Sequence, residues 1–348
     1  MNIMITGATG FVGTKLMKSL LKEGHSLYPI VRNEQKMDQL LASMSDEEAL
    51  RVHPVAGDIT QVDLGITPTT QKELDQQIDV FYHTAAFLSF DPADRKKTFF
   101  VNVEGTQHAL DLAKKIHVKS FKHVSTAYTV GLDNHAEETL HSTDRQFVND
   151  YEESKCHAEH LVWEHRHELN VSIFRPAIIV GDSNTGEANT TFALYGLLKA
   201  VALLRKMIQR GRIDQNRTIQ LLSKGAASSN VVPVNYVVDV LTAGATHSER
   251  NKIYHISNNH TPKNEEVLEW IKKFSGVHQL AIVDEPHTLT AEDEIINEPM
   301  SVFHSYLSRT LIFEDSNTKK LLDRAGTEEL QLSDEKYKML IRVYFEKN

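Results

Sequence analysis

Short apolar runs alternate with longer amphipathic or polar segments along the first half of the chain. The apolar runs lie at residues 2–5, 26–31, 52–56, 79–84, 121–124 and 171–175. The segments at residues 11–21, 34–50, 95–116 and 151–170 have the spacing or composition of helices. Regular alternation of strands and helices is typical of a parallel sheet with helices on both faces. We therefore predict an α/β fold with a Rossmann-type, doubly wound parallel sheet.

The regular alternation of predicted strands and helices becomes less clear after Gly181. Residues 190–210 predict a helix whose apolar face carries Leu194, Leu197, Leu198, Val201 and Leu204. Residues 231–256 predict a strand, a helix and a strand. We expect residues 1–180 to form the Rossmann domain, with residues 231–257 contributing to its core. A smaller C-terminal α/β domain, from residues 181–230 and 258–348, is expected to bind the substrate.

Composition narrows the class of protein. The chain has 348 residues, 41% of them hydrophobic, and a net charge of −9, which argues against a nucleic-acid partner. The single cysteine, Cys156, excludes an internal disulfide. The first predicted strand begins at Asn2 and no apolar run is long enough to span a bilayer, so we expect a cytoplasmic protein without a transmembrane segment.

A glycine-rich turn joins the first predicted strand to the first predicted helix. Gly7 suits the tight turn, Gly10 lets a pyrophosphate approach the backbone, and Gly13 lets the helix pack on the strand. The helix N-terminus adds free N–H groups for the phosphates. An ordinary glycine turn is the alternative. We expect this segment to bind a dinucleotide through Gly7, Thr9, Gly10, Phe11, Val12 and Gly13.

Three later strand ends add candidate cofactor contacts. Arg32 follows the second strand, where it suits a 2′-phosphate and favours NADP (NADPH) over NAD, although a solvated surface arginine is the alternative. Asp58, next to Ile59, follows the third strand and could accept a hydrogen bond from the adenine amino group, unless it is a plain turn aspartate. Small residues after the fourth strand let the cofactor lie close, so we add Thr84, Ala85 and Ala86.

Tyr151 and Lys155 lie one helical turn apart, on one face of a predicted helix. An ammonium beside a phenol favours the phenolate and brings the tyrosine into range for proton transfer. The lysine can also hold the nicotinamide ribose, so we expect Tyr151 and Lys155 to contact the cofactor as well. Ser125 and Thr126 end the fifth strand, where a hydroxyl could polarise a reacting carbonyl. A second pair with this spacing, Tyr195 and Lys199, lies among apolar residues, so we interpret Tyr195 as core or pocket lining.

The helix at residues 151–170 also carries a concentration of potential metal ligands. They are Cys156, His157, His160, His165 and His167. No compact second group of ligands completes a site, so we expect no metal. The alternative interpretation is a helix that faces solvent or another subunit.

Taken together, these motifs resemble those of the extended short-chain dehydrogenases/reductases. The resemblance rests on residues 6–13, Asp58-Ile59, residues 102–106, Ser125–Tyr128, Tyr151–Lys155 and Arg175-Pro176. Within that superfamily the chain is most similar to the male-sterility branch, which includes fatty acyl-CoA reductases and the terminal thioester-reductase domains of peptide and polyketide synthases. Residues 123–128, 175–182 and 232–239 carry this narrower likeness.

The resemblance implies a role for each matching residue. Thr126 would be the catalytic hydroxyl, with Ser125 as its substitute, Tyr151 the general acid and Lys155 its partner. Asn102 would lie near a proton-relay water. The nicotinamide carboxamide would be lined by Pro176, Ala177 and Ile178. In related reductases the histidine-rich helix often forms a dimer interface, so a homodimer is one option.

The resulting functional hypothesis is an NADP(H)-dependent reductase of a carbonyl or an acyl thioester. One alternative is a sterol- or dihydroflavonol-type hydroxy/keto dehydrogenase. A sugar-nucleotide epimerase or dehydratase is less favoured, because Thr129-Val130-Gly131 replaces the Val-Tyr-Gly string of those enzymes. A regulator that senses NADP without turnover is the non-enzymatic alternative, and the Tyr151–Lys155 pair argues against it.

Overall fold

The computed structural model describes residues 1–188, 194–286 and 289–348, which form two compact units. The first contains Met1–Pro176, Tyr236–Ile256 and Glu314–Glu329, and the second contains Ala177–Asn235, Ser257–Phe313 and Leu330–Asn348. This division differs from the expected boundaries at four places: residues 177–180, 231–235 and 257 lie in the second unit, and residues 314–329 lie in the first. Among the described residues, no helix is both long and apolar enough to cross a membrane.

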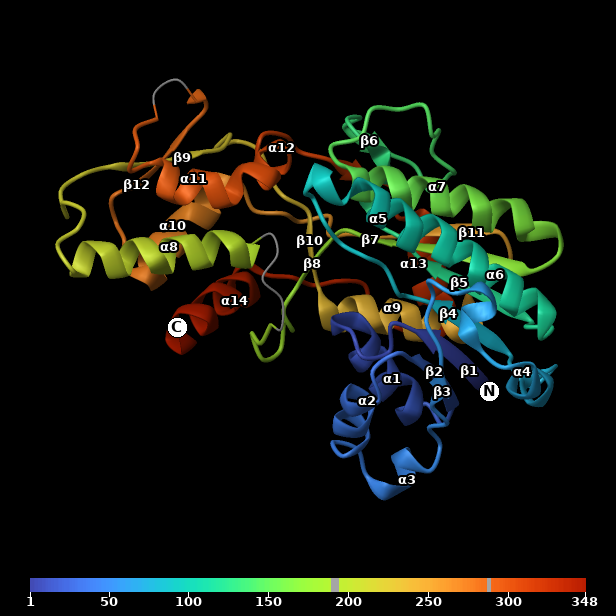
Figure 1. The fold of residues 1–348 in the computed structure, drawn as a ribbon. Coiled ribbons are helices and arrows are strands. Elements are labelled where there is room, and N and C mark those ends of the chain that lie inside the picture. The colour runs from blue at the N-terminus through green and yellow to red at the C-terminus, as the bar shows by residue number, and fades with distance from the viewer. Residues whose placement is uncertain (189–193, 287–288) are drawn as a thin grey trace. The chain divides into compact units, whose positions relative to one another are not determined.

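A seven-stranded parallel sheet organises the first unit and confirms the predicted fold class (Figure 1). The strand order is β11-β7-β5-β4-β1-β2-β3. The strands are β1 (Asn2–Thr6), β2 (Ser26–Val31), β3 (Val55–Ala56), β4 (Val80–His83), β5 (Ser120–Val124), β7 (Asn170–Pro176) and β11 (Lys252–Ile256). The order reverses beside β1, where ligands of such sheets bind at the carboxyl ends of the strands.

Helices cover both faces of this sheet. Helices α6 (Gly105–Lys115) and α7 (Asp150–Glu164) lie on one face, and α1 (Phe11–Lys22) and α9 (Val234–His247) on the other (Figure 1). The Tyr82 hydroxyl donates to the backbone oxygen of Leu241, which ties β4 to α9. The remaining helices of this unit are α2 (Glu34–Leu41), α3 (Asp46–Ala49), α4 (Pro68–Leu74), α5 (Arg95–Phe99) and α13 (Ser316–Ala325).

Two predicted helices are interrupted in the structure. The segment 34–50 forms α2 and α3, because Ser45 starts a new helix with a capping box that involves Glu48. The segment 95–116 forms α5 and α6, with a π-helical turn at Phe100–Glu104 between them. The predicted loop at residues 132–150 contains the short strand β6 (His135–Ala136).

A buried ion pair fixes α7 against the sheet. The Arg175 guanidinium on β7 binds the Glu159 carboxylate on α7, with its Nη2 atom 2.6 Å from Oε2, and neither side chain is exposed. Two ring nitrogens, those of His141 and His255, accept from Nη1 at 3.2 and 3.3 Å. Burial and the nearby Arg175 charge lower the pKa of both histidines to about 3, so both rings are neutral acceptors.

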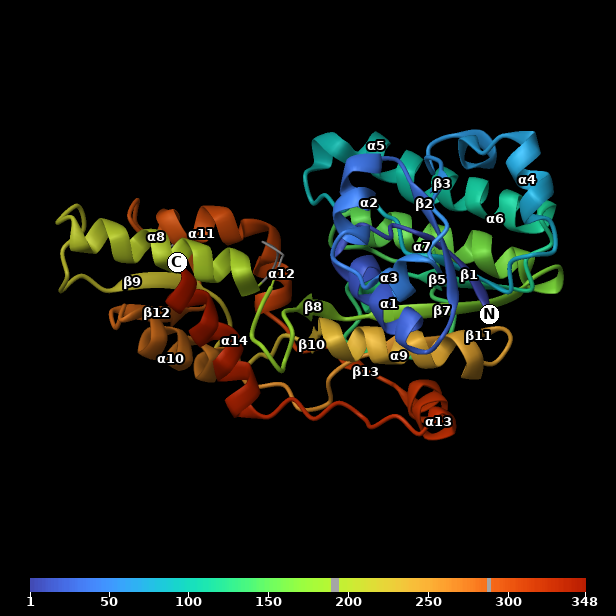
Figure 2. The same cartoon turned by 90° about the horizontal axis from the view of Figure 1, so that it is seen from below.

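The second unit is a smaller α/β assembly (Figure 2). Its parallel strand pairs are β8 (Ile178–Val180) with β10 (Val231–Pro233), and β9 (Ile219–Leu222) with β12 (Leu280–Val283). Its helices include α8 (Leu194–Gln209), α10 (Asn264–Ser275), α11 (Glu294–Met300), α12 (His304–Leu307) and α14 (Asp334–Lys347). The predicted helix at 190–210 thus corresponds to α8, and residues 190–193 of that prediction lie outside the described residues.

Candidate active site

Where β1 turns into α1, the backbone leaves no room for a side chain at Gly7 or at Gly13. Gly7 has a φ of +72°, and a Cβ there would lie 2.8 Å from the backbone nitrogen of Ala85. A Cβ on Gly13 would lie 2.1 Å from the Gly7 carbonyl oxygen. Gly10 donates to that same oxygen at 2.9 Å and caps α1 without a side chain. The first N–H groups of α1 are therefore available to an anion.

A cleft of about 860 Å³ opens at this turn, in the first unit. Its walls include most of the predicted cofactor residues, namely Gly7, Thr9, Gly10, Phe11, Val12, Gly13, Arg32, Asp58, Ile59, Thr84, Ala85, Ala86 and Tyr151. They also include residues that the sequence analysis missed: Asn33, Lys36, Thr60, Phe87, Leu88, Lys97 and Val101. The turn, the candidate ribose-phosphate contacts and Tyr151 thus line one continuous space.

One end of the cleft is electropositive. The Arg32 side chain is 77% exposed, and its Nη1 atom lies 3.8 Å from Oδ2 of Asp58. Asp58 is oriented by Thr60, whose backbone N–H and hydroxyl both donate to Oδ1. Lys36, in the first turn of α2, adds a second cation to the same wall. Lys36 could have been found from its position in the first turn of the helix that follows Arg32.

The neighbouring strand end holds the glycine turn in place. The Thr84 hydroxyl donates to the Thr6 carbonyl oxygen at 2.6 Å, and the Ala85 N–H donates to the Thr6 hydroxyl at 3.2 Å. These bonds join the ends of β1 and β4, which flank the reversal in strand order. Thr84 and Ala85 therefore support the turn as well as line the cleft.

Tyr151 lies in the first turn of α7, far from Arg32 in sequence but in the same cleft. Its ring meets Phe90 edge-on, with centroids 6.3 Å apart. Burial, aided by the nearby Glu152 carboxylate, raises the pKa of Tyr151 to about 12. This is the opposite direction from the one the Tyr–Lys pair predicts, because removal from water outweighs any help from the lysine.

Lys155 is buried beneath Tyr151 on the same helix, with 1% of its surface exposed. Its Nζ atom donates to the Val124 carbonyl oxygen at 2.9 Å and lies 3.2 Å from Nε2 of His123. Burial lowers the pKa of Lys155 to about 8, partly offset by the Glu159 carboxylate. The ammonium is therefore anchored to the end of β5.

The two hydroxyls that follow β5 differ in their surroundings. The Thr126 hydroxyl accepts from the Tyr128 N–H at 3.3 Å and donates to the Pro176 carbonyl oxygen at 3.5 Å, a long hydrogen bond. The Ser125 hydroxyl is buried and has no hydrogen-bond partner among the described residues. Both remain candidates for the group that polarises a carbonyl.

Asn102 connects the cleft wall to α7. Its amide nitrogen donates to the Phe87 carbonyl oxygen and the Ser154 hydroxyl, each at 3.0 Å, and its oxygen accepts from the Phe87 N–H at 2.7 Å. Ser154 in turn donates to the Tyr151 carbonyl oxygen. Asn102 thus helps to fix the first turn of α7, and its predicted place beside a relay water stays a prediction.

The residues predicted to line the nicotinamide are divided between the two units. Pro176 ends β7 in the first unit, whereas Ala177 and Ile178 belong to the second. Ile178 lines an apolar cavity of about 60 Å³ there. The predicted contact of these three residues with the cofactor stays a prediction.

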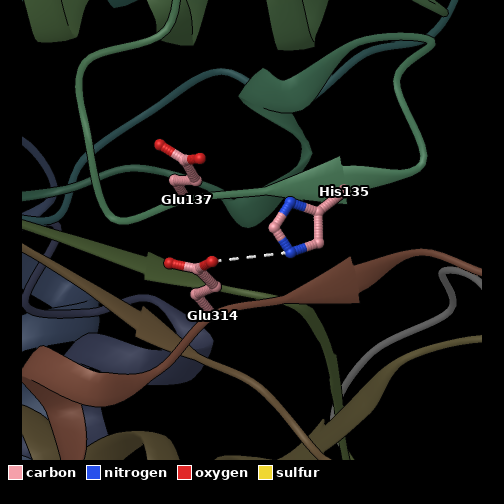
Figure 3. Close-up of side chains that lie close together, drawn as sticks. All are labelled: His135, Glu137 and Glu314. Carbon is pink, nitrogen blue, oxygen red and sulfur yellow. Dashed lines mark ion pairs between the residues drawn. The ribbon is translucent and has the colours of Figure 1, made fainter.

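Residues in the histidine-rich part of α7 pack and hydrogen-bond within the first unit. Cys156 is buried, which raises the pKa of its thiol to about 12, and His160 bonds the His141 carbonyl oxygen at 2.7 Å. A different group, His135, Glu137 and Glu314, brings its ligand atoms within 4.8 Å of one another among the described residues. All three are exposed, and an ion pair of 3.6 Å joins His135 to Glu314 (Figure 3). Exposed acidic groups commonly lie close together without an ion, so this grouping alone does not indicate a metal site.

Known proteins resemble the chain across both units. It is 30% identical over 184 residues to sterol demethylase protein B of Methylococcus capsulatus, which covers 52% of each chain. It is 24% identical over 319 residues to fatty acyl-CoA reductase wat of Drosophila melanogaster, covering 77% of this chain and 58% of that one. The chain thus spans a little over half the length of these curated relatives.

A solved structure has the same fold. The terminal R domain from the myxalamid PKS-NRPS biosynthetic pathway superposes with a TM-score of 0.81 at 24% identity, covering 99% of this chain and 89% of that one. The family model described as male sterility protein matches residues 5–241. That match includes the glycine turn, the cleft and the Tyr151–Lys155 pair, as the motifs predicted. The chain therefore belongs to the male sterility protein family, within the extended short-chain dehydrogenases/reductases.

Proposed function

We propose that the chain is an NADP(H)-dependent reductase whose substrate carbonyl is presented as an acyl thioester. The observation that carries the proposal is that one cleft is lined by the glycine turn, Arg32 and Tyr151. A dinucleotide-binding surface that contains a candidate proton donor is what a hydride-transfer enzyme requires.

The cofactor fits the chemistry of the cleft wall. The turn offers unobstructed backbone and the N-terminal N–H groups of α1 to a pyrophosphate. Arg32 and Lys36 would bind the 2′-phosphate that distinguishes NADP from NAD. When bound, the reduced nicotinamide supplies the hydride that reduces the carbonyl carbon.

The residues around Tyr151 would handle the proton. At neutral pH a phenol with a pKa of about 12 is protonated, so Tyr151 can donate a proton to the developing oxyanion. The Lys155 ammonium would stabilise the resulting phenolate. The Thr126 hydroxyl, or the unpaired Ser125 hydroxyl, would donate a hydrogen bond to the carbonyl oxygen.

Replacing Arg32 with alanine should weaken NADPH binding by about 10- to 100-fold, because a hydrogen bond to a charged group contributes about 1.5–3 kcal/mol. Affinity for NADH should change little, since NADH lacks the 2′-phosphate. Fluorescence titration of both cofactors against the wild type and the Arg32→Ala variant measures this. Tighter binding of NADH by the wild type, or an unchanged NADPH affinity in the variant, would contradict the NADP assignment.

The second unit supplies a candidate site for an acyl chain. Its 60 Å³ cavity is enclosed mainly by apolar side chains, including Leu194 and Leu197 of the predicted stripe on α8. The other members of that stripe, Leu198, Val201 and Leu204, have no exposed surface and pack the core of the unit. The N-terminal end of the stripe, Leu194 and Leu197, therefore supports binding of an acyl chain, and the rest of the stripe packs the unit. The likeness to a fatty acyl-CoA reductase favours a thioester over a sugar nucleotide.

A substrate panel tests the proposed function. Loss of nicotinamide absorbance should be seen with long-chain acyl-CoA, and turnover should rise with chain length if apolar burial contributes to binding. The panel should also include aldehydes, ketosteroids and UDP-sugars. Activity confined to aldehydes or ketones would instead indicate a keto-reductase, and no NADPH oxidation with any carbonyl would favour a cofactor-sensing regulator.

A further inference from the structure

The partner of the buried Lys155 ammonium is a histidine rather than a carboxylate. The His123 side chain has no exposed surface, and its Nε2 atom lies 3.2 Å from Nζ of Lys155. An ammonium has only donors, so Nε2 must be the acceptor in this contact. The ring proton then lies on Nδ1, which has no partner among the described residues.

His123 stays neutral in this position. A proton on Nε2 would place two cations 3.2 Å apart inside the protein. Burial, together with the Lys155 charge and the neighbouring His83 ring, holds the pKa of His123 well below its usual range. The acceptor is consequently present over the whole pH range in which such an enzyme works.

A second histidine fixes the orientation of the first. The rings of His83 and His123 stack with centroids 5.5 Å apart and an interplanar angle of 24°. Nδ1 of His83 lies 2.9 Å from the Thr6 hydroxyl, and Nε2 lies 3.1 Å from the Thr106 hydroxyl. Thr106 uses its own proton to donate to the Asn102 carbonyl oxygen at 2.6 Å. It therefore accepts from Nε2–H of His83, and Thr6 donates to Nδ1.

This arrangement connects the cofactor turn to the lysine. Thr6 immediately precedes Gly7, and its hydroxyl also accepts from the Ala85 N–H in the cleft wall. His83 is held at both ring nitrogens, so the stacked His123 ring has little freedom to rotate. Of the three ammonium N–H groups of Lys155, two are used in hydrogen bonds within the described residues, to His123 and to the Val124 carbonyl oxygen.

We propose that His123, supported by His83, is a positioning residue. It holds the Lys155 ammonium so that one N–H remains for the role that the proposed function gives it, stabilisation of the Tyr151 phenolate. The inference rests on the proposed function, which gives Lys155 its role beside Tyr151. A neutral acceptor suits this purpose because it orients the cation without cancelling its charge, as a buried carboxylate would.

Replacing His123 with leucine should lower kcat by about 10- to 100-fold, the loss that misplacement of a reacting group produces. Affinity for NADPH should change much less than kcat. The His123→Gln variant, whose amide oxygen is also a neutral acceptor, should recover most of the turnover. This rescue distinguishes positioning from packing, because glutamine restores a hydrogen-bond acceptor but does not reproduce the shape of the imidazole ring.

The pH profile gives a readout that a structural role would not move. Loss of protonated Lys155 should make activity fall above pH 8, because burial lowers its pKa to about 8. Removing the His123 acceptor destabilises the ammonium, so the alkaline limb should move to lower pH by about one unit in His123→Leu. The other ionisable groups that influence Lys155 and His123, namely Glu159 on α7 and His83 on β4, are unchanged in this variant.

His141→Leu is the matched control, since His141 is also a buried neutral histidine of the first unit but binds Arg175 and Thr129. It should lower the melting temperature without moving the alkaline limb. NMR of protein labelled at lysine Cε gives the Lys155 pKa without turnover, also in His123→Gln if the leucine variant does not fold. An unchanged Lys155 pKa and an unchanged kcat in His123→Leu would overturn the proposal. It would also be overturned if His123→Gln altered both quantities as much as His123→Leu does.

The same experiments distinguish this inference from the proposed function. If Lys155→Met abolishes turnover while His123→Leu behaves as wild type, the reductase assignment stands and the positioning role of His123 is wrong. If Lys155→Met and Tyr151→Phe both retain full turnover, the roles assigned to these two residues are wrong. If the wild type oxidises no NADPH with any carbonyl of the substrate panel, the proposed function is wrong, whatever the Lys155 pKa is in His123→Leu.

Discussion

Replacing Tyr151 with phenylalanine should lower kcat at least a hundredfold, the contribution expected of a positioned general acid, and leave NADPH affinity nearly unchanged. The substitution removes only the hydroxyl, and the ring can keep its edge-on contact with Phe90. Tyr151 is a lining residue of the cleft, and the proposed function assigns its hydroxyl to the substrate carbonyl. Single-turnover oxidation of NADPH with an acyl-CoA measures the chemical step, and fluorescence titration measures the binding.

The chain contains its own control for this prediction. Tyr195 and Lys199 repeat the same spacing on α8, but the Tyr195 hydroxyl accepts a hydrogen bond from the Gly181 N–H at 2.9 Å. Lys199 is exposed to solvent. Tyr195→Phe should therefore reduce the free energy of unfolding by about 1 kcal/mol and leave turnover intact. Native turnover in Tyr151→Phe together with an inactive Tyr195→Phe would show that the wrong pair has been assigned.

The sheet and the glycine turn could be predicted because their signals are local. Each strand is a short apolar run, and the turn shows its three glycines at fixed spacing between a strand and a helix. Arg32 and Asp58 follow from the same logic, since residues after parallel strands gather at one edge of the sheet. The structure accordingly brings both into the cleft wall with Gly10.

The interruptions and the packing of distant segments could not be predicted in the same way. The break before α3 had a readable signal, the Ser45–Glu48 capping box, which the polar composition of residues 34–50 concealed. By contrast, residues 314–329 join the first unit because the Glu138 carboxylate accepts the backbone N–H groups of Asn317 and Thr318 at the start of α13. No local sequence pattern predicts a contact between residues so far apart in the chain.

The histidine support of Lys155 was missed for a related reason. His83 and His123 each lie at or near the end of an apolar strand, where a polar residue is usually taken as facing solvent or a ligand. Both are buried because adjacent parallel strands align them, with His83 opposite His123 in the register of β4 and β5. That register, and not either strand alone, creates the stack.

The glycine turn gives the other large expected effect, and it separates two roles of glycine. A Cβ on Gly13 would meet the backbone of Gly7 and Ala8 at 2.1 to 2.9 Å, and backbone atoms in a closed turn have little room to retreat. Gly13→Ala should therefore reduce the free energy of unfolding by about 3 kcal/mol or more. For a domain of this class the melting temperature should fall by about 6–12 °C.

Gly10→Ala should have the opposite profile. Its Cβ would lie 3.1 Å from the Gly7 carbonyl oxygen, which a shift of a few tenths of an ångström relieves, so the melting temperature should change little. The added methyl group would nevertheless stand where the pyrophosphate approaches the start of α1, and NADPH affinity should fall at least tenfold. Thermal melts with and without NADPH measure both effects in the two variants.

Gly225→Ala is the control for these melts, because its Cβ would contact only side-chain atoms, with the flexible end of Glu265 nearest at 3.3 Å. It should lose neither stability nor NADPH affinity. If Gly10→Ala binds NADPH as tightly as the wild type, the pyrophosphate does not lie on this turn. If Gly13→Ala melts at the wild-type temperature, the close approach of α1 to β1 is not required, since a clash with backbone at 2.1 Å has no flexible partner to absorb it.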